Sequence, residues 1–234
     1  MTPKIFAHRG ASAHAPENTI AAFKLAVDQK ADGIELDVTL SQDGQIVVIH
    51  DDSVDRTTNG EGEVSDLTLA ELQALDAGQG EHIPTLEEVF EAVGKSVLVN
   101  IELKNIKLFS NKLPDQVAQF IKTYNLMDDV IISSFNPFYL QRIRRQCPQA
   151  KTGLLTLPRM AKLWFWRFFR YDALHPFYQD VSRSLVEKIK QHGKQINTWT
   201  VDDPQELKRL MLLGVDGIIT NDPQRTREIM ESVP

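Results

Sequence analysis

Short runs of β-branched and other apolar residues alternate with helical patterns along almost the whole chain of 234 residues. Capping-box signals mark two helix starts, because Thr68 and Thr85 are each followed three residues later by a glutamate. Strands that alternate with helices and look buried on both faces predict a parallel sheet covered by helices. We expect nine strands, at residues 4–7, 33–40, 46–49, 97–103, 130–134, 152–156, 173–175, 196–201 and 217–220.

The number of strands favours a closed barrel, because one of the nine can be assigned to a local hairpin outside the parallel sheet. Only five residues separate the strands at 33–40 and 46–49, and they include Asp43-Gly44. Five residues are too few for a parallel crossover, so we expect an antiparallel hairpin. Eight parallel strands remain, at about 29 residues per β/α unit (234/8), close to the barrel norm. We therefore predict an α/β fold, a single (β/α)8 TIM barrel over residues 1–234, with a small loop-and-helix insertion around 52–83.

Composition excludes several classes of protein. The chain carries 26 Lys and Arg against 32 Asp and Glu, a formal charge of -6, so we expect no nucleic-acid partner. A lone Cys147 cannot form a disulfide within the chain. The first residues show no apolar signal segment, and no window approaches the roughly 20 apolar residues of a membrane helix. These features predict a cytoplasmic protein.

Polar side chains gather where the predicted strands end, and this is the face on which TIM barrels carry their function. A two-residue Asp43-Gly44 loop would pair Asp37 with His50. Side chains alternate between faces along a strand, so Glu35, Asp37 and His50 would then share one face. The groups expected near this mouth are His8, Arg9, Glu35, Asp37, His50, Asp51, Glu102, Lys104, Ser134, Phe135, His175, Trp199, Asn221 and Asp222.

Three of these groups are carboxylates. Glu35 and Asp37 lie two residues apart on one strand, and Glu102 ends a neighbouring strand. An all-carboxylate cluster suits a hard divalent ion, Mg²⁺ or Ca²⁺. The alternative is that the acids serve only as ion-pair partners of Arg9 and Lys104.

The remaining groups fit a phosphoester better than a sugar or a carbonyl compound. His8 and His50 can carry protons near neutral pH. Arg9 and Lys104 can neutralise phosphate oxygens.

Seven motifs occur in order from about residue 5 to residue 223. Together they resemble the glycerophosphodiester phosphodiesterase family, in particular its compact cytoplasmic bacterial type. The motifs are Ala7-His-Arg-Gly10, Pro16-Glu-Asn-Thr19, Gly33-Ile-Glu-Leu-Asp37, Val48-Ile-His-Asp51, Arg56-Thr-Thr-Asn-Gly60, Ile101-Glu-Leu-Lys104 and Thr198-Trp-Thr-Val201.

This resemblance implies a TIM-barrel enzyme that uses Mg²⁺ or Ca²⁺ to hydrolyse glycerophosphodiesters to sn-glycerol 3-phosphate and an alcohol. It further implies that the insertion at 52–83 caps the site. Carried over by position, the metal ligands are Glu35, Asp37 and Glu102, the catalytic acid and base are His8 and His50, and the substrate contacts are Arg9, Lys104 and Trp199.

The expected mechanism uses the glycerol 2-hydroxyl of the substrate, which is tethered close to phosphorus. One histidine would deprotonate this hydroxyl and the other would protonate the departing alcohol, with a cyclic phosphate between the two steps. His8 is expected to be the base and His50 the acid. Direct attack by a metal-bound water is the competing route.

Other functions share part of this pattern. A lysophospholipase D or sphingomyelinase D type of enzyme would use the same residues on lipid substrates. A glycoside hydrolase needs two carboxylates but explains neither the histidines nor Lys104. A catalytically inactive phosphate-binding barrel would not need the complete set of acids and bases.

Several residues receive a structural interpretation. Aromatic and basic residues at 160–171 favour a helix packed on the barrel over membrane contact through Trp164, Phe165, Trp166, Phe168 and Phe169. Asn18 is expected to cap the first helix. The remaining histidines are expected to be structural or exposed: His14, His82, His175 and His192.

Overall fold

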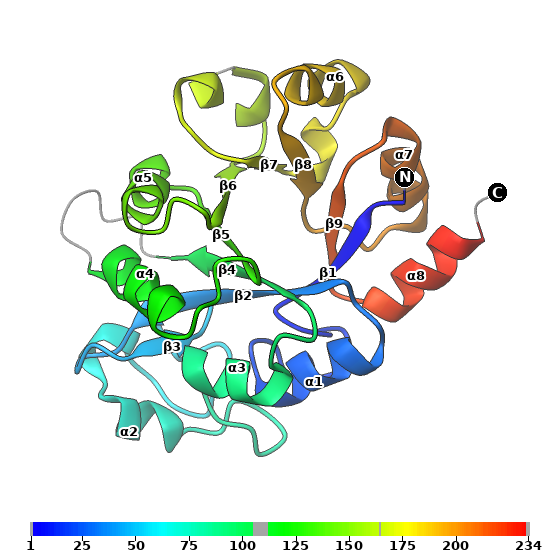
Figure 1. The fold of residues 1–234 in the computed structure, drawn as a ribbon. Coiled ribbons are helices and arrows are strands. Elements are labelled where there is room, and N and C mark those ends of the chain that lie inside the picture. The colour runs from blue at the N-terminus through cyan, green and yellow to red at the C-terminus, as the bar shows by residue number, and fades with distance from the viewer. Residues whose placement is uncertain (1, 105–111, 164, 233–234) are drawn as a thin grey trace.

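The computed structural model describes residues 2–104, 112–163 and 165–232. Eight parallel strands form a closed ring with helices around its outside (Figure 1). The ring closes because β1 pairs with both β2 and β9. Its strands are β1 (Lys4–His8), β2 (Gly33–Leu40), β4 (Leu98–Leu103), β5 (Val130–Ser134), β6 (Lys151–Thr156), β7 (Ala173–Pro176), β8 (Gln195–Thr198) and β9 (Gly217–Thr220). The predicted TIM barrel is confirmed.

Helices connect consecutive strands of the ring. Both predicted capping boxes are present, at Thr68 and Thr85. The helices are α1 (Ile20–Asp28), α2 (Leu69–Gln73), α3 (Leu86–Val93), α4 (Leu113–Thr123), α5 (Pro137–Gln146), α6 (Arg183–Gln191), α7 (Pro204–Leu213) and α8 (Pro223–Glu231), with 3₁₀ helices η1 (Val64–Asp66), η2 (Met160–Leu163), η3 (Phe165–Phe168) and η4 (Tyr178–Asp180).

The predicted hairpin is present, but its register was wrong by one residue. β3 (Ile46–Val48) runs antiparallel on β2 outside the ring, and Thr39 pairs with Val47. The loop holds three residues, 42–44, rather than two, because Gly44 takes a left-handed conformation at φ +79° and donates its N–H to Ser41. Residue 49, not His50, therefore lies across from Asp37, whose carbonyl accepts from Ile49 N at 3.0 Å.

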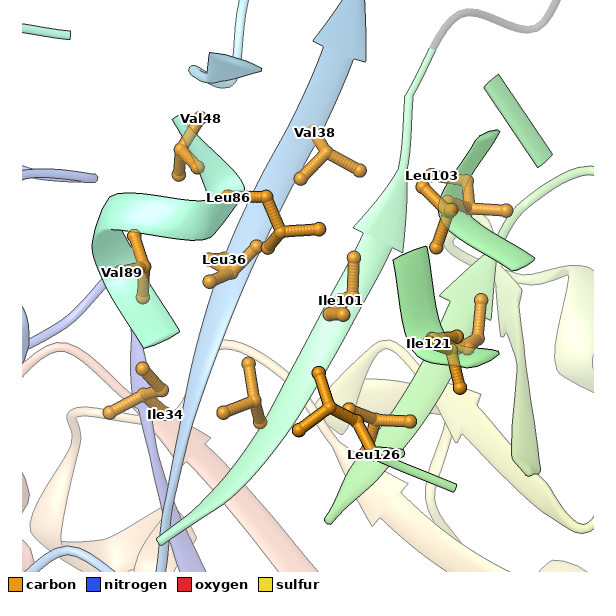
Figure 2. Packing of buried hydrophobic residues seen from close by; sticks show 14 of the residues in the cluster. Ile34, Leu36, Val38, Val48, Leu86, Val89, Ile101, Leu103, Ile121 and Leu126 are labelled. Carbon is orange, nitrogen blue, oxygen red and sulfur yellow. The ribbon is translucent and has the colours of Figure 1, made fainter. Parts of the chain in front are cut away.

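Most of the apolar core lies between the strands and the helices, outside the barrel, and a smaller cluster of Phe6, Ile131 and Ile219 fills part of its interior. Residues at even positions of β2 point outward, and Leu36 lies beside Leu86 of α3 and Ile101 of β4 (Figure 2). Alternation along the strand leaves Glu35 and Asp37 facing the barrel interior. The apolar residues of β2 thus hold the strand in place, and the acidic residues between them are free to build a site.

The insertion at 52–83 has its own small apolar cluster, as expected for an excursion of loops and short helices. It contains η1 and α2 and packs on the β3 edge. The cluster consists of Val47, Ile49, Val54, Val64, Leu72, Ala77 and Ile83.

The aromatic segment at 160–171 forms two 3₁₀ helices instead of the single helix expected. Trp166 and Tyr171 are buried, and Trp166 Nε1 donates to the Ala161 carbonyl at 2.8 Å. Packing on the barrel is therefore confirmed for these two residues, whereas Phe168 is 79% exposed. Trp164 lies outside the described residues. Within the described ranges, no helix has both the length and the apolar character needed to cross a bilayer.

His175 on β7 is buried in the barrel interior, in agreement with a structural role. Its Nε2 accepts from Asn197 Nδ2 at 3.0 Å. Burial lowers its pKa to about 4, because the charged imidazolium would lose its hydration.

This histidine should make stability depend on pH. Between pH 6.5 and 4 the unfolded chain binds a proton at His175 and the folded chain does not, so stability should fall as pH falls. The loss should reach roughly 3 kcal/mol at pH 4. Urea unfolding of wild type and His175→Gln at pH 7, 5 and 4 measures it. The variant should lose less stability over this range, and an identical loss in both proteins would contradict the assignment.

Candidate active site

Three carboxylates meet at the carboxyl ends of β2 and β4. Glu35 and Asp37 follow one another on the inner face of β2, and Asp37 lies level with Glu102 on β4 in the parallel register. One oxygen of each lies within 4.8 Å of an oxygen of each of the others. All three side chains are buried, and Asp37 is only 1% exposed. The predicted ligand set is therefore brought together by the pairing of two adjacent strands.

Two cations lie against this acidic cluster. Lys104 Nζ is 3.0 Å from Glu102 Oε1 and 3.5 Å from Asp37 Oδ1. Arg9 donates its backbone N–H to Glu35 Oε2 at 3.1 Å, and its Nε lies 3.3 Å from Asp37 Oδ2. The ion pairs anticipated as an alternative explanation therefore exist, but three carboxylates share two cations.

The pKa shifts in the cluster follow from burial first and from the charges of neighbouring groups second. Burial and repulsion from Asp37 raise the pKa of Glu35 well above its ordinary value. The same two causes raise the pKa of Glu102 to about 7. For Asp37, burial is outweighed by Lys104 and Arg9, so its pKa is lowered. Lys104 and Arg9 therefore leave part of the repulsion among the three carboxylates uncompensated, and a further positive charge would reduce it.

Asn18 contributes to this cluster, which sequence reasoning missed. It was expected to cap α1, but Thr19 is the cap and accepts from Ala22 N. Asn18 takes a left-handed conformation at φ +58°, and its Nδ2 donates to Asp37 Oδ2 at 3.0 Å. The signal was its position in Pro16-Glu-Asn-Thr19, a motif quoted for the resemblance.

His8 ends β1 and has an amide as its partner. Its Nδ1 donates to Asn221 Oδ1 at 2.7 Å, and the Asn221 amide is oriented because its Nδ2 donates to Asp202 Oδ2 at 2.6 Å. This arrangement leaves His8 Nε2 as the unprotonated nitrogen of a neutral ring. Burial, followed by the charge of Arg9, lowers the pKa of His8.

His50 has a carboxylate as its partner. Its Nδ1 donates to Asp51 Oδ1 at 2.5 Å. β3 ends at Val48, so His50 follows the strand and strict alternation of faces no longer applies to it. His50 nevertheless lines the same pocket as Glu35 and Glu102, so its placement near the acids was correct, although the register offered for it was wrong.

A pocket of about 210 Å³ collects these groups. Its polar side is lined by His8, Arg9, Glu35, His50, Asn100, Glu102 and Lys104, and its apolar side by Phe135, Leu155, Trp199 and Ile219. Asp37 lies behind this lining. A larger cavity of about 420 Å³ at the opposite barrel mouth has neither histidines nor the acidic cluster, so the chemistry belongs to the smaller pocket.

Trp199 forms a fixed wall of the pocket. Its Nε1 donates to the His175 carbonyl at 2.9 Å. The rings of Phe135 and Phe177 lie edge-on at 5.7 and 5.6 Å between centroids. An aromatic wall opposite a charged wall suits a ligand with both a phosphate and a carbon skeleton.

The cluster of Glu35, Asp37 and Glu102 could hold a divalent metal ion. Three converging carboxylates offer the hard oxygen donors that Mg²⁺ and Ca²⁺ prefer. Burial, together with repulsion from Asp37, raises the pKa values of Glu35 and Glu102, so a positive ion at this place would stabilise their charged forms. The residues present therefore fit such an ion.

Comparison with known proteins agrees with this geometry. A sequence model of the glycerophosphoryl diester phosphodiesterase family matches residues 8–225. The glycerophosphodiester phosphodiesterase of Caldanaerobacter subterraneus is 48% identical over 234 residues, which cover 96% of each chain.

Solved structures are also similar to this chain over nearly its whole length. A phosphodiesterase of Oleispira antarctica, in complex with the product sn-glycerol-3-phosphate, has a TM-score of 0.88 at 31% identity, with 99% of this chain and 98% of that chain covered. A glycerophosphodiester phosphodiesterase of Agrobacterium tumefaciens has a TM-score of 0.84 at 30% identity, with 97% and 99% covered. A barrel mouth that combines a buried acidic triad with two histidines, in a chain matched over nearly its whole length, places this protein in the glycerophosphoryl diester phosphodiesterase family.

Proposed function

We propose that this protein hydrolyses glycerophosphodiesters to sn-glycerol 3-phosphate and an alcohol, with Mg²⁺ or Ca²⁺ as cofactor. The observation that carries the proposal is one pocket lined by two histidines with different Nδ1 partners, beside a buried acidic cluster. The complex of a 31% identical phosphodiesterase with sn-glycerol-3-phosphate supports the same product.

The charged wall would bind the phosphate. Glu35, Asp37 and Glu102 would hold the metal ion, which would stabilise negative charge on the non-bridging oxygens when bound. Arg9 and Lys104 would contact the same oxygens from the protein side. Trp199 would face the glycerol carbons and exclude water from them.

The two histidines would move the protons. His8 Nε2 takes the proton of the glycerol 2-hydroxyl, whose oxygen then forms a bond to phosphorus. His50 Nε2 gives a proton to the alcohol oxygen as its bond to phosphorus breaks. Water then opens the five-membered cyclic phosphate, with the roles of the two histidines reversed. The proton count balances over the two steps, because each histidine ends in its starting state.

The assignment of base and acid follows from the Nδ1 partners. His8 donates to a neutral amide and its pKa is lowered, so it is unprotonated and ready to accept a proton. His50 donates to the Asp51 carboxylate, and a negative partner of this kind stabilises an imidazolium in catalytic triads. The hydrogen bond from Arg56, with a smaller contribution from His50, lowers the pKa of Asp51 to about 2 against the opposing effect of burial, so this partner stays charged.

The proposal is tested by a coupled assay for glycerol 3-phosphate release. Several glycerophosphodiesters are offered in this assay, and a lysophospholipid is offered in a parallel assay for release of its headgroup alcohol, both with EDTA and then with Mg²⁺ or Ca²⁺ added back. We expect turnover of the short diesters, its loss in EDTA and its recovery with metal. Turnover of the lysophospholipid alone would favour the lipid-cleaving alternative, and no phosphodiester turnover at all would overturn the function.

The cyclic route and the two histidine roles make a joint prediction. Glycerophosphate esters of an alkyl alcohol and of p-nitrophenol are assayed with wild type, His8→Ala and His50→Ala. Release of the alcohol is followed in a single turnover, because His50 also serves the later opening of the cyclic phosphate. A good leaving group needs little protonation, so in this first step His50→Ala should lose roughly 10²–10⁴-fold on the alkyl ester and far less on the nitrophenyl ester. His8→Ala should lose a similar factor on both.

A 2-deoxy nitrophenyl ester serves as the control for the nucleophile. It lacks the hydroxyl that attacks phosphorus and should not be hydrolysed by wild type. Efficient hydrolysis would replace the cyclic route by direct attack of water. Equal sensitivity of the two histidine variants to the leaving group would contradict the assignment of base and acid.

A further inference from the structure

Arg56 connects the insertion to both sides of the pocket. Its Nε donates to Asp51 Oδ2 at 2.5 Å. Its Nη1 and Nη2 donate to the two oxygens of Glu17, at 2.9 and 2.8 Å. Asp51 in turn holds His50, and Glu17 accepts from Arg9 Nη1 at 2.8 Å. A chain of charged hydrogen bonds therefore runs from Arg9 to His50 through one guanidinium.

The two acids in this chain remain ionised. Against the effect of burial, Arg56 and Arg9 lower the pKa of Glu17 to about 2. The pKa of Asp51 is about 2, with the hydrogen bond from Arg56 as its largest cause. Arg56 itself is exposed over 48% of its side chain, so solvent screens each pair. These hydrogen bonds therefore contribute more through the fixed orientation of the groups they join than through their energy.

The guanidinium is shaped for this task. It offers several N–H groups in one plane, so it can meet Asp51 on one edge and Glu17 on the other. A lysine is a point charge on a flexible stem and cannot hold both carboxylates in fixed directions. Without the guanidinium, Asp51 can rotate away from His50 Nδ1, and Arg9 is then the one ion-pair partner of Glu17 among the residues that the structure describes.

We propose that Arg56 is a positioning residue through which the insertion sets the orientation of His50 and of Arg9. The proposal rests on the function proposed above for these two residues. Loss of Arg56 affects proton transfer, because His50 loses the fixed partner of its Nδ1. It affects substrate binding as well, because Glu17 then draws the Arg9 guanidinium away from the phosphate position.

The test compares Arg56→Gln and Arg56→Lys with wild type. Both variants should lose roughly 10- to 100-fold in kcat, the range seen when a residue that orients a ligand of a metal site is removed. Both should show a higher KM as well. Long-range ¹H–¹⁵N spectra of labelled histidines should show a change at His50 and none at His175, in the absence of substrate.

Arg227→Gln is the matched control, because Arg227 bridges the Lys30 carbonyl and Asp32 at the other end of the barrel. Its kcat should stay within about twofold of wild type. Wild-type kinetics and unchanged His50 signals in Arg56→Gln would overturn the proposal, and Arg56→Lys decides if the glutamine variant does not fold. If wild type lacks diesterase activity, the proposed function fails, and the His50 signals still decide whether Arg56 positions that ring.

Discussion

Three carboxylates buried within reach of one another are the constraint on which the structure of this site depends. Isolated buried charges are costly, and like charges at this distance repel one another. The protein supplies Lys104 and Arg9 as partners, yet Glu35 and Glu102 still have raised pKa values. A barrel mouth with this excess of negative charge is suited to a divalent cation, and through it to a phosphate group.

The histidines show how one residue type can be given two tasks by its neighbours. His8 and His50 line the same pocket, but an amide oxygen accepts from one Nδ1 and a carboxylate from the other. Each partner is itself held, Asn221 by Asp202 and Asp51 by Arg56. The chemistry assigned to each ring therefore depends on residues outside the pocket lining.

Periodicity and strand counting were sufficient for the fold. Apolar residues at alternate positions of β2 and β4 identify both the strands and the inward faces that carry Glu35, Asp37 and Glu102. The hairpin register was wrong because a two-residue and a three-residue loop look alike around Asp43-Gly44. The backbone of Asp43 tells them apart, because a two-residue type I′ loop needs positive φ at both Asp43 and Gly44, and of the two only Gly44 has it.

The partners of the site residues were harder to predict. Asn18 precedes a helix and therefore resembled a cap. The N-cap is Thr19, and the side-chain amide of Asn18 donates to Asp37 instead. Glu17 and Arg56 lie 39 residues apart, and no local pattern indicates that they meet. Contacts of this kind depend on how the insertion folds back on the barrel, which propensity and spacing do not encode.

Calorimetric titration of the metal-free protein with Ca²⁺ and Mg²⁺ tests the central claim most directly. Wild type should bind one ion per chain and show a higher melting temperature with it. Glu35→Gln should lose this binding while Glu228→Gln, a change at an exposed helix position, should retain it. Absence of ion binding by folded wild type, or equal binding by both variants, would contradict the account.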